Sequence, residues 1–284
     1  MPGEVVITDA DRSYIYDHGY VPEHLVEYVA AIAQAEPFLL DDFIMYTSGE
    51  RLILVGYPLR GSFVEKELQK VLDKAVNRFK PLEVSVTAPC LPSSIRSENE
   101  TLVDYYYRLD LGAVAPSQKL RNLLRRAERE LEVRKASSMT NEHERLINEF
   151  IETHSLNEST RFILSKVPDY VSRSGTARIF EVRTKDEALV AFDVADFGSK
   201  AYVYYLFNFR SRERYIPGAS DLLLRHIAGV AKTEGRAYVN LGLGISGGVS
   251  FFKKKWGATP FAPHIAYVYQ PAARTAVQTL LERL

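Results

Sequence analysis

Three consecutive lysines and the only tryptophan of the chain lie in GISGGVSFFKKKWGATP, which spans Gly244–Pro260. Glycines such as Gly244 and Gly247 let a backbone approach a ligand closely. A lysine ammonium group is a strong partner for phosphate. The stretch therefore predicts a contact with a phosphorylated ligand that involves Gly244, Gly247 and Lys253, or else a basic surface helix that faces only solvent.

The spacing of the apolar residues predicts a helix over about residues 248–256 of this stretch. At 100° per residue, Lys254 points nearly opposite to the apolar face, whereas Lys253 and Lys255 lie on its two flanks. We expect Lys253 to reach the ligand. The residues of the apolar face are Val249, Phe252 and Trp256.

A second candidate anion site is the loop IPGAS, Ile216–Ser220, which leads into a predicted helix. The unpaired N–H groups and the positive dipole end of a helix N-terminus suit a pyrophosphate, with Gly218 and Ser220 as contacts. The alternative is a plain helix start in which Ser220 caps the helix and Asp221 favours the dipole but repels an anion. The upstream arginines that would add positive charge are Arg210, Arg212 and Arg214.

Arginines also recur at every fourth residue in SQKLRNLLRRAERELEVR, which we predict to be a helix over Ser117–Arg134. Arg121, Arg125 and Arg129 would share its outer face, opposite a leucine stripe. Like charges at this spacing repel one another. The stripe therefore indicates either a contact with RNA or phospholipid, or a solvated face that nearby glutamates partly compensate.

The overall composition excludes several classes of protein. The 284 residues carry 36 basic and 36 acidic side chains, so the net charge is +0 and any anionic partner needs a local patch. A single cysteine, Cys90, excludes an intramolecular disulfide. The six histidines show no metal-ligand spacing, and no apolar stretch reaches the length of a membrane span. We expect a cytoplasmic protein without a metal and without stable membrane insertion.

Two segments share one order of elements, a strand, a helix and a second strand, which favours a parallel strand pair in each. The first copy is predicted at Arg51–Tyr57, Val64–Phe79 and Leu82–Ala88. The second copy is predicted at Ala201–Phe209, Ser220–Glu234 and Ala237–Gly244.

Hairpins are predicted before each copy, with turns at Ser48–Gly49, at Lys185–Asp186 and near Gly198. Both halves thus predict a mixed α/β fold, in which a mostly antiparallel sheet contains one parallel strand pair. The turn-rich stretch 89–117 separates them. We predict an N-terminal domain over residues 1–110 and a C-terminal domain over residues 111–284.

This order of elements resembles the GNAT acyltransferase fold, in which the parallel pair is splayed and flanked by helices. The second half resembles tandem-GNAT proteins more specifically, among them Fem-type aminoacyltransferases and the soluble domain of lysyl-phosphatidylglycerol synthases. The first half resembles them only in topology. The stretches that carry the resemblance are SQKLRNLLRRAERELEV, YIPGASDLLLRHIAGVAKTEGRAYVNLGLG and GGVSFFKKKWGA, whose closing motif selects Lys253.

Two positions depart from the pattern of these proteins. The aspartate of the closing strand is Asn240 here, and IPGAS stands where an acetyl-CoA fingerprint of glycines is usual. The resemblance implies two tandem GNAT-like domains, of which the N-terminal one is degenerate in motif and the C-terminal one holds the active site.

The resemblance also implies the chemistry: an amine must lose a proton, and a tetrahedral oxyanion must be stabilised. The backbone near Phe207–Phe209 would stabilise the oxyanion, and Asn208 and Asn240 would orient the donor carbonyl. Asp193 or Asp196 would act as the base, and only one of the two can face the cleft. Tyr267 would protonate the leaving group, with packing as the alternative.

The implied activity is the transfer of an acyl or aminoacyl group to an amine or hydroxyl acceptor. The donor would be an acyl-CoA or an aminoacyl-tRNA, and no other cofactor is implied. A narrower reading is tRNA-dependent aminoacyl transfer to a cell-wall precursor or lipid. A different class remains open, a tandem-GNAT protein that binds a metabolite or partner without catalysis.

Overall fold

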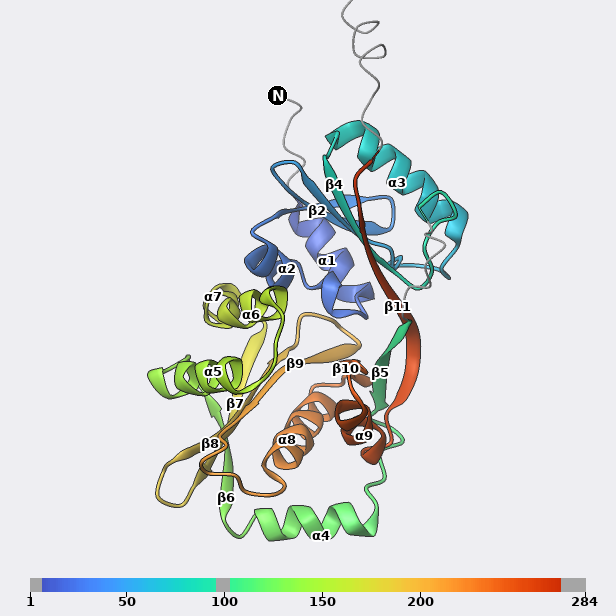
Figure 1. The fold of residues 1–284 in the computed structure, drawn as a ribbon. Coiled ribbons are helices and arrows are strands. Elements are labelled where there is room, and N and C mark those ends of the chain that lie inside the picture. The colour runs from blue at the N-terminus through green and yellow to red at the C-terminus, as the bar shows by residue number, and fades with distance from the viewer. Residues whose placement is uncertain (1–6, 96–102, 272–284) are drawn as a thin grey trace, which may run out of the picture.

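The computed structural model describes residues 7–95 and 103–271, and within them eleven strands form one mixed sheet (Figure 1). The strand order is β1-β2-β3-β4-β11-β5-β10-β9-β8-β7-β6. The strands are β1 Glu36–Leu40, β2 Phe43–Ser48, β3 Arg51–Val55, β4 Glu83–Ala88, β5 Asp104–Asp110, β6 Leu131–Ala136, β7 Ala177–Thr184, β8 Leu189–Asp196, β9 Tyr202–Arg210, β10 Tyr238–Leu243 and β11 Thr259–Tyr269.

Helices cover both faces of this sheet. In the N-terminal half, α3 packs on one face and the α1–α2 segment on the other. In the C-terminal half, α4, α8 and α9 lie on one face and α5, α6 and α7 on the other. The helices are α1 Asp9–His18, η1 Pro22–His24, α2 Val26–Ala33, α3 Glu65–Phe79, α4 Gln118–Ala127, α5 Asn141–Thr153, α6 Glu158–Ser165, α7 Val167–Arg173, α8 Ala219–Thr233 and α9 Gly247–Lys255.

The predicted repeat is confirmed. Strands β3 and β4 are parallel with α3 between them in the chain, and β9 and β10 are parallel with α8 between them. The hairpin turns after Ser48 and after Thr184 are also present. Amphipathic spacing explains α3, because Leu68, Val71 and Leu72 fall on one face and are buried.

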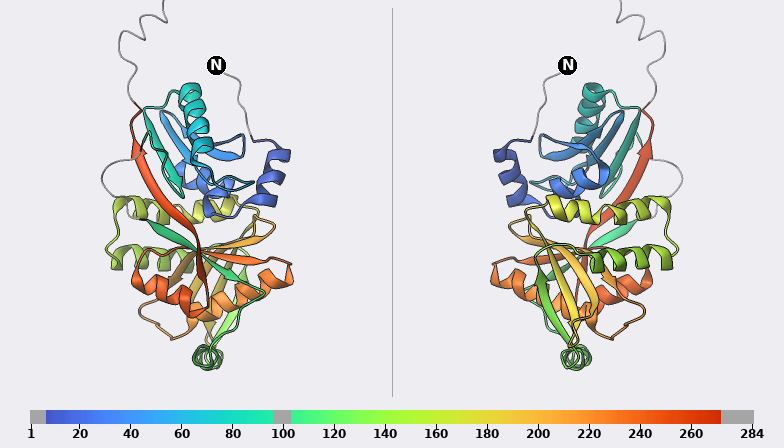
Figure 2. Two further views of the ribbon diagram at one scale, coloured as in Figure 1. Left: turned by 90° about the vertical axis from the view of Figure 1, so that its right-hand side faces the viewer. Right: turned by 90° about the vertical axis from the view of Figure 1, so that its left-hand side faces the viewer.

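One strand from the end of the described chain joins the two halves. The first part of β11, residues 259–264, pairs with β5, and its last part, residues 265–269, pairs with β4. Figure 2 shows β11 running from the lower half of the molecule to the upper half. Strand β5 in turn pairs with β10. The division at residue 110 stays a prediction, and β5, which precedes it, pairs with β10 of the C-terminal half.

The predicted helix over Ser117–Arg134 is wrong in its second part. Helix α4 ends at Ala127, a turn follows, and Leu131 begins β6, which pairs with β7 over six residues. Pairing with the edge of the sheet buries Leu131 as effectively as the helical stripe would. The pairing with β7 therefore decides that these residues form a strand, although their apolar spacing also fits a helix. As a consequence, Arg129 lies in the turn and not on the helical face of Arg121 and Arg125.

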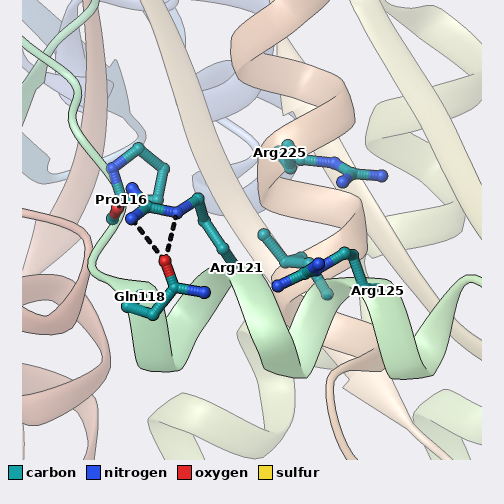
Figure 3. A pocket seen from close by; sticks show the side chains of 6 residues that line it. Pro116, Gln118, Arg121, Arg125 and Arg225 are labelled. Carbon is teal, nitrogen blue, oxygen red and sulfur yellow. Dashed lines mark hydrogen bonds between the residues drawn. The ribbon is translucent and has the colours of Figure 1, made fainter.

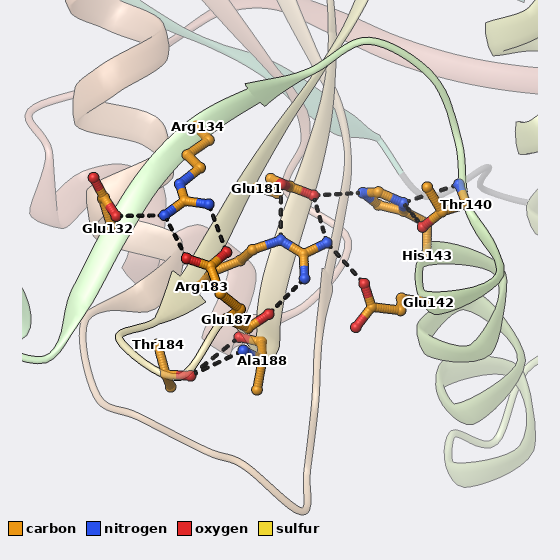
Figure 4. Close-up of polar contacts among 10 residues, drawn as sticks. All are labelled: Glu132, Arg134, Thr140, Glu142, His143, Glu181, Arg183, Thr184, Glu187 and Ala188. Carbon is orange, nitrogen blue, oxygen red and sulfur yellow. Dashed lines mark hydrogen bonds and ion pairs between the residues drawn. The ribbon is translucent and has the colours of Figure 1, made fainter.

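A buried ion network fastens α5 to β7 (Figure 4). The Glu181 carboxylate accepts from Arg183 Nε at 2.8 Å and lies 3.2 Å from His143 Nε2. Arg183 also pairs with Glu142 at 2.8 Å. His143 is fully buried, and burial is the main cause that lowers its pKa. A neutral imidazole whose Nε2–H faces Glu181 fits this environment.

We predict that Glu181→Ala lowers the free energy of unfolding by roughly 3 kcal/mol, because it leaves the largely buried Arg183 guanidinium with one acidic partner fewer. Urea denaturation measures this change. The matched control is Glu187→Ala, which removes the carboxylate that pairs with Arg134 at the protein surface (Figure 4). Exposed pairs contribute little, so equal effects of the two substitutions would contradict the prediction.

Candidate active site

The two parallel strands of the C-terminal half separate after a short paired stretch. Residues 238–240 of β10 pair with residues 202–204 of β9, and no further pairing between the two strands follows. Strand β9 also contains a bulge, since Val194 of β8 opposes Phe207 and Ala195 opposes Tyr205. Leu206 is therefore left without a partner on β8. A splay beside a bulge leaves backbone groups of β9 available to a ligand.

Asn240 lies at the point where the strands diverge and is fully buried. Its Oδ1 accepts from the Gly242 N–H at 2.8 Å, and its Nδ2 donates to the Tyr20 carbonyl at 2.8 Å. Gly242 has φ +74°, which favours glycine, and the register of β10 with β5 shifts here. Both polar atoms of Asn240 thus hold protein groups, and the predicted contact with a donor carbonyl stays a prediction.

The loop after β10 surrounds a carboxylate from the protein itself. Asp104 accepts from the backbone N–H groups of Gly244 at 3.0 Å and Ile245 at 2.8 Å. Burial raises the pKa of Asp104, but these N–H donors and nearby Lys253 outweigh it and lower the pKa overall. A Cβ at Gly244 would lie 2.6 Å from Asp104 Oδ1. The close approach at Gly244 is therefore to Asp104, while a Cβ at Gly247 would meet open space.

Of the three lysines, Lys253 is the one that points inward. Its exposed fraction is 5%, its Nζ donates to the Leu243 carbonyl, and burial lowers its pKa to about 8. Lys254 is exposed, as predicted. Lys255 instead pairs with buried Asp221 at 2.6 Å. Lys253 thus reaches the end of β10, and its contact with a ligand stays a prediction.

The N-terminus of α8 brings three predicted residues together. Ser220 Oγ donates to Asn208 Oδ1 at 3.0 Å, and Asn208 Nδ2 donates to Asp193 Oδ1. Asp193 is fully buried, and its Oδ2 has no hydrogen-bond partner among the described residues. Burial raises the pKa of Asp193 well above its usual value. Asp196 faces the other side of the sheet, where Tyr170 and Thr176 donate to it.

Helix α4 lies directly against the loop that precedes α8. Gly218 has φ +93°, and a Cβ there would lie 3.0 Å from the Ala127 Cβ and 3.3 Å from Leu123 Cγ. The arginines upstream of this loop have other contacts. Arg210 lies over the Tyr215 ring, and Arg212 bonds through its backbone N–H to Glu149 of α5 at 2.7 Å.

Arginines from two helices line a pocket of about 580 Å³ between α4 and α8 (Figure 3). Arg121 donates to Gln118 Oε1 at 2.7 Å and Arg125 donates to Asn122. Both partners are neutral. The third arginine of the pocket is Arg225 of α8, not the predicted Arg129, and it pairs with Glu128. Sequence reasoning missed Arg225 because nothing in the pattern of α8 indicates which face meets α4.

The structure does not bring Tyr267 to the other candidates. Tyr267 lies opposite Val86 of β4 and packs in the cluster around α3 of the N-terminal half. Its ring stacks on Tyr269 at a centroid distance of 6.2 Å. This is the packing alternative that the sequence left open.

A polar cluster that the sequence analysis missed lies where the two halves meet. Tyr106 donates to Glu23 Oε1 at 2.8 Å, and Tyr46 donates to the Glu23 carbonyl at 2.9 Å. His24 Nδ1 accepts from the Tyr20 N–H at 3.2 Å, and its Nε2 bonds to the Tyr57 carbonyl at 2.9 Å. These residues come from η1, β2, β5 and the segments before η1 and after β3, and no local motif indicates that they meet.

No protein-family model and no curated protein matches this sequence. Solved structures do resemble it. L-PGS from Bacillus licheniformis is 16% identical, with a TM-score of 0.58 over 99% of this chain and 98% of that one. FemX is 11% identical, with a TM-score of 0.58 over 96% and 97%. A GCN5-related N-acetyltransferase from Kribbella flavida is 11% identical, with a TM-score of 0.50 over 89% and 98%.

Together with the repeated strand–helix–strand units, these likenesses define the fold of the chain. The chain has a tandem-GNAT fold, as the sequence motifs predicted. At these identities the likeness concerns the fold. In residues 7–95 and 103–271, no helix is both long and apolar enough to cross a membrane. The same residues contain no group of three or more histidines, cysteines or acidic side chains that could hold a metal ion.

We predict that His24 makes the stability of the fold depend on pH. Burial lowers its pKa from 6.5 to about 4. Between these values the unfolded chain binds a proton that the folded chain does not, so stability is lost as the pH falls. Relative to His24→Gln, the wild type should lose about 2 kcal/mol between about pH 7.5 and pH 5 in urea denaturation. Parallel pH curves for the two proteins would contradict this.

Proposed function

We propose that the chain is an acyltransferase that binds the acyl group of its donor between β9 and β10. The observation that carries the proposal is the separation of these parallel strands after Tyr204 and Asn240, next to the bulge in β9. The fold shared with L-PGS, FemX and an N-acetyltransferase supports the reaction class. Fold alone does not establish an activity, so the residues at the splay must support it.

The reaction needs donors for an oxyanion and a controlled proton. The backbone of β9 at Leu206 suits the oxyanion, because the bulge leaves Leu206 without a partner on β8. Asp193 was expected to act as a base. Burial raises the pKa of Asp193, and its Oδ1 accepts from Asn208, whose own Oδ1 accepts from Ser220. Asp193 therefore suits the positioning of Asn208 and Ser220 at the splay.

For the donor we favour an aminoacyl-tRNA over an acyl-CoA. A CoA pyrophosphate would be expected at the N-terminus of α8, but α4 packs against Gly218 at this position. In addition to packing against Gly218, α4 contributes to the pocket with Arg121, Arg125 and Arg225. These arginines suit a contact with the phosphodiester backbone of a tRNA. The acceptor is an amine or a hydroxyl group.

We predict that Arg125→Ala weakens tRNA binding several-fold and lowers the slope of log affinity against log salt by about one. Fluorescence anisotropy with labelled aminoacyl-tRNA at several salt concentrations measures both. The matched control is Lys119→Ala, which removes an exposed cation from α4 outside the pocket. The assignment to the pocket fails if both substitutions have the same effect.

Two other results of the binding experiments would change the assigned donor or would argue against an enzyme. Saturable binding of acyl-CoA in calorimetry, without salt-dependent tRNA binding, would assign the splay to a thioester donor. Binding of neither donor would leave the non-catalytic alternative, in which the fold binds a metabolite or partner.

We also predict that Lys253→Met weakens donor binding by about tenfold or more, because Lys253 fixes the backbone at the end of β10 through the Leu243 carbonyl. Its neighbour Lys254 is exposed, so Lys254→Met is the matched control and should bind the donor as the wild type does. The melting temperature should fall as well, because the Leu243 carbonyl loses its donor, so donor binding is measured well below it. Unchanged donor binding would show that Lys253 is only structural.

A further inference from the structure

The Glu23 carboxylate has an unusual environment for a negative charge. Its Oε1 accepts from Tyr106, while its Oε2 is buried and has no hydrogen-bond partner among the described residues. Residues 7–95 and 103–271 contain no ion pair of Glu23 with a basic side chain. Burial raises the pKa of Glu23, because no cation of the described chain compensates a carboxylate there. A buried carboxylate oxygen without a partner is costly unless a ligand or water binds it.

Aromatic side chains surround this carboxylate. Tyr106 donates to Glu23 Oε1 and Tyr46 donates to the Glu23 carbonyl, so both rings lie beside Glu23. The Tyr57 and Tyr106 rings meet edge to face at a centroid distance of 5.7 Å. The tyrosines supply hydroxyls and aromatic faces, and aromatic faces attract cations.

The two nearby histidines supply no positive charge at neutral pH. His24 is fully buried with a pKa of about 4, and burial also lowers the pKa of His264, whose ring lies 5.2 Å from that of Tyr106. A carboxylate among aromatic rings, without a basic partner from the described chain, matches the requirements of an ammonium ion.

The position of Glu23 connects it with the strand splay. Tyr106, its hydrogen-bond donor, lies opposite Leu243 at the irregular end of β10. Three residues before Glu23, the Tyr20 carbonyl accepts from Asn240, where β9 and β10 diverge. Figure 1 shows the α1–α2 segment, which contains η1, above β9 and β10. The carboxylate is therefore on the side of the splay that faces the N-terminal half.

We infer that Glu23 is the anchor of a binding site for a primary ammonium group at the splay, with the surrounding tyrosines as its walls. The inference rests on the proposed function, because a transferase at this splay brings an amine there either on the acceptor or on the aminoacyl group. In both cases Glu23 Oε2 accepts a hydrogen bond from the ammonium group and balances its charge.

The test uses small probes on the full chain. Propylamine stands for the acceptor amine, L-alaninamide for an aminoacyl group, and 1-propanol is the neutral control of similar shape. Ligand-observed NMR titrations should show that wild type binds at least one amine and binds 1-propanol more weakly by about tenfold or more. Propylamine binding assigns the site to the acceptor, and binding of L-alaninamide alone assigns it to the donor.

Glu23→Gln should abolish amine binding, because it removes the charge and keeps an acceptor for Tyr106. Glu27→Gln is the matched control, since Glu27 lies in the same segment and pairs with Arg12 at the surface. Tyr106→Phe leaves the carboxylate in place and should retain binding, which keeps the test valid if Glu23→Gln does not fold. Equal binding of amine and alcohol, or unchanged amine binding in Glu23→Gln, would overturn the inference. Binding of tRNA in the same preparation would show that only this inference fails.

Discussion

The backbone hydrogen bonds of β11 hold the rest of this structure in place. One strand pairs with β5 in one half and with β4 in the other. Each half therefore depends on a strand that is distant in sequence, and the two repeated units form one sheet. Because β5 pairs in turn with β10, this connection also fixes the strand edge at which the site lies. The proposed site thus lies next to the strand that joins the two halves.

Side-chain hydrogen bonds fix the backbone conformation at the end of β10. Three side chains from three elements bind an irregular stretch of about five residues. Asn240 holds the Gly242 N–H from within the strand, Asp104 holds the Ile245 N–H from β5, and Lys253 holds the Leu243 carbonyl from α9. Ile245 has φ +53°, a conformation that a β-branched residue adopts only when its surroundings determine it. Such a fixed backbone suits the recognition of a reacting group.

The sequence predicted the repeated units well, because their signals are local. Apolar periodicity, turn residues and element order predicted the parallel pairs, the hairpins and α3, and the motifs of the second half predicted the fold class. The end of α4 was not predictable in this way. Leu131 fits a helical stripe and a strand equally, and only pairing with β7 decides between them.

The candidate site was predictable only in part, for a related reason. Helical geometry allowed Lys253 or Lys255 to point inward, and the closing motif selected Lys253. The hydrogen bonds from Ser220 to Asn208 and from Asn208 to Asp193 join residues that the sequence had proposed separately. Glu23 and Arg225 were missed because each acquires its neighbours from a distant element. Tyr267 lies in the part of β11 that pairs with β4 of the N-terminal half. The sequence of β11 alone does not indicate where its pairing changes from β5 to β4.

The departure at Asn240 changes the role of the N-terminal half. An aspartate at this buried position could accept from the Gly242 N–H, but it could not donate to the Tyr20 carbonyl, and its charge would face that carbonyl oxygen. The amide does both. It therefore attaches the segment that carries Glu23 to the point where β9 and β10 separate. The N-terminal half thus supplies one wall of the proposed site, and the asparagine that departs from the pattern is the residue that holds this wall in position.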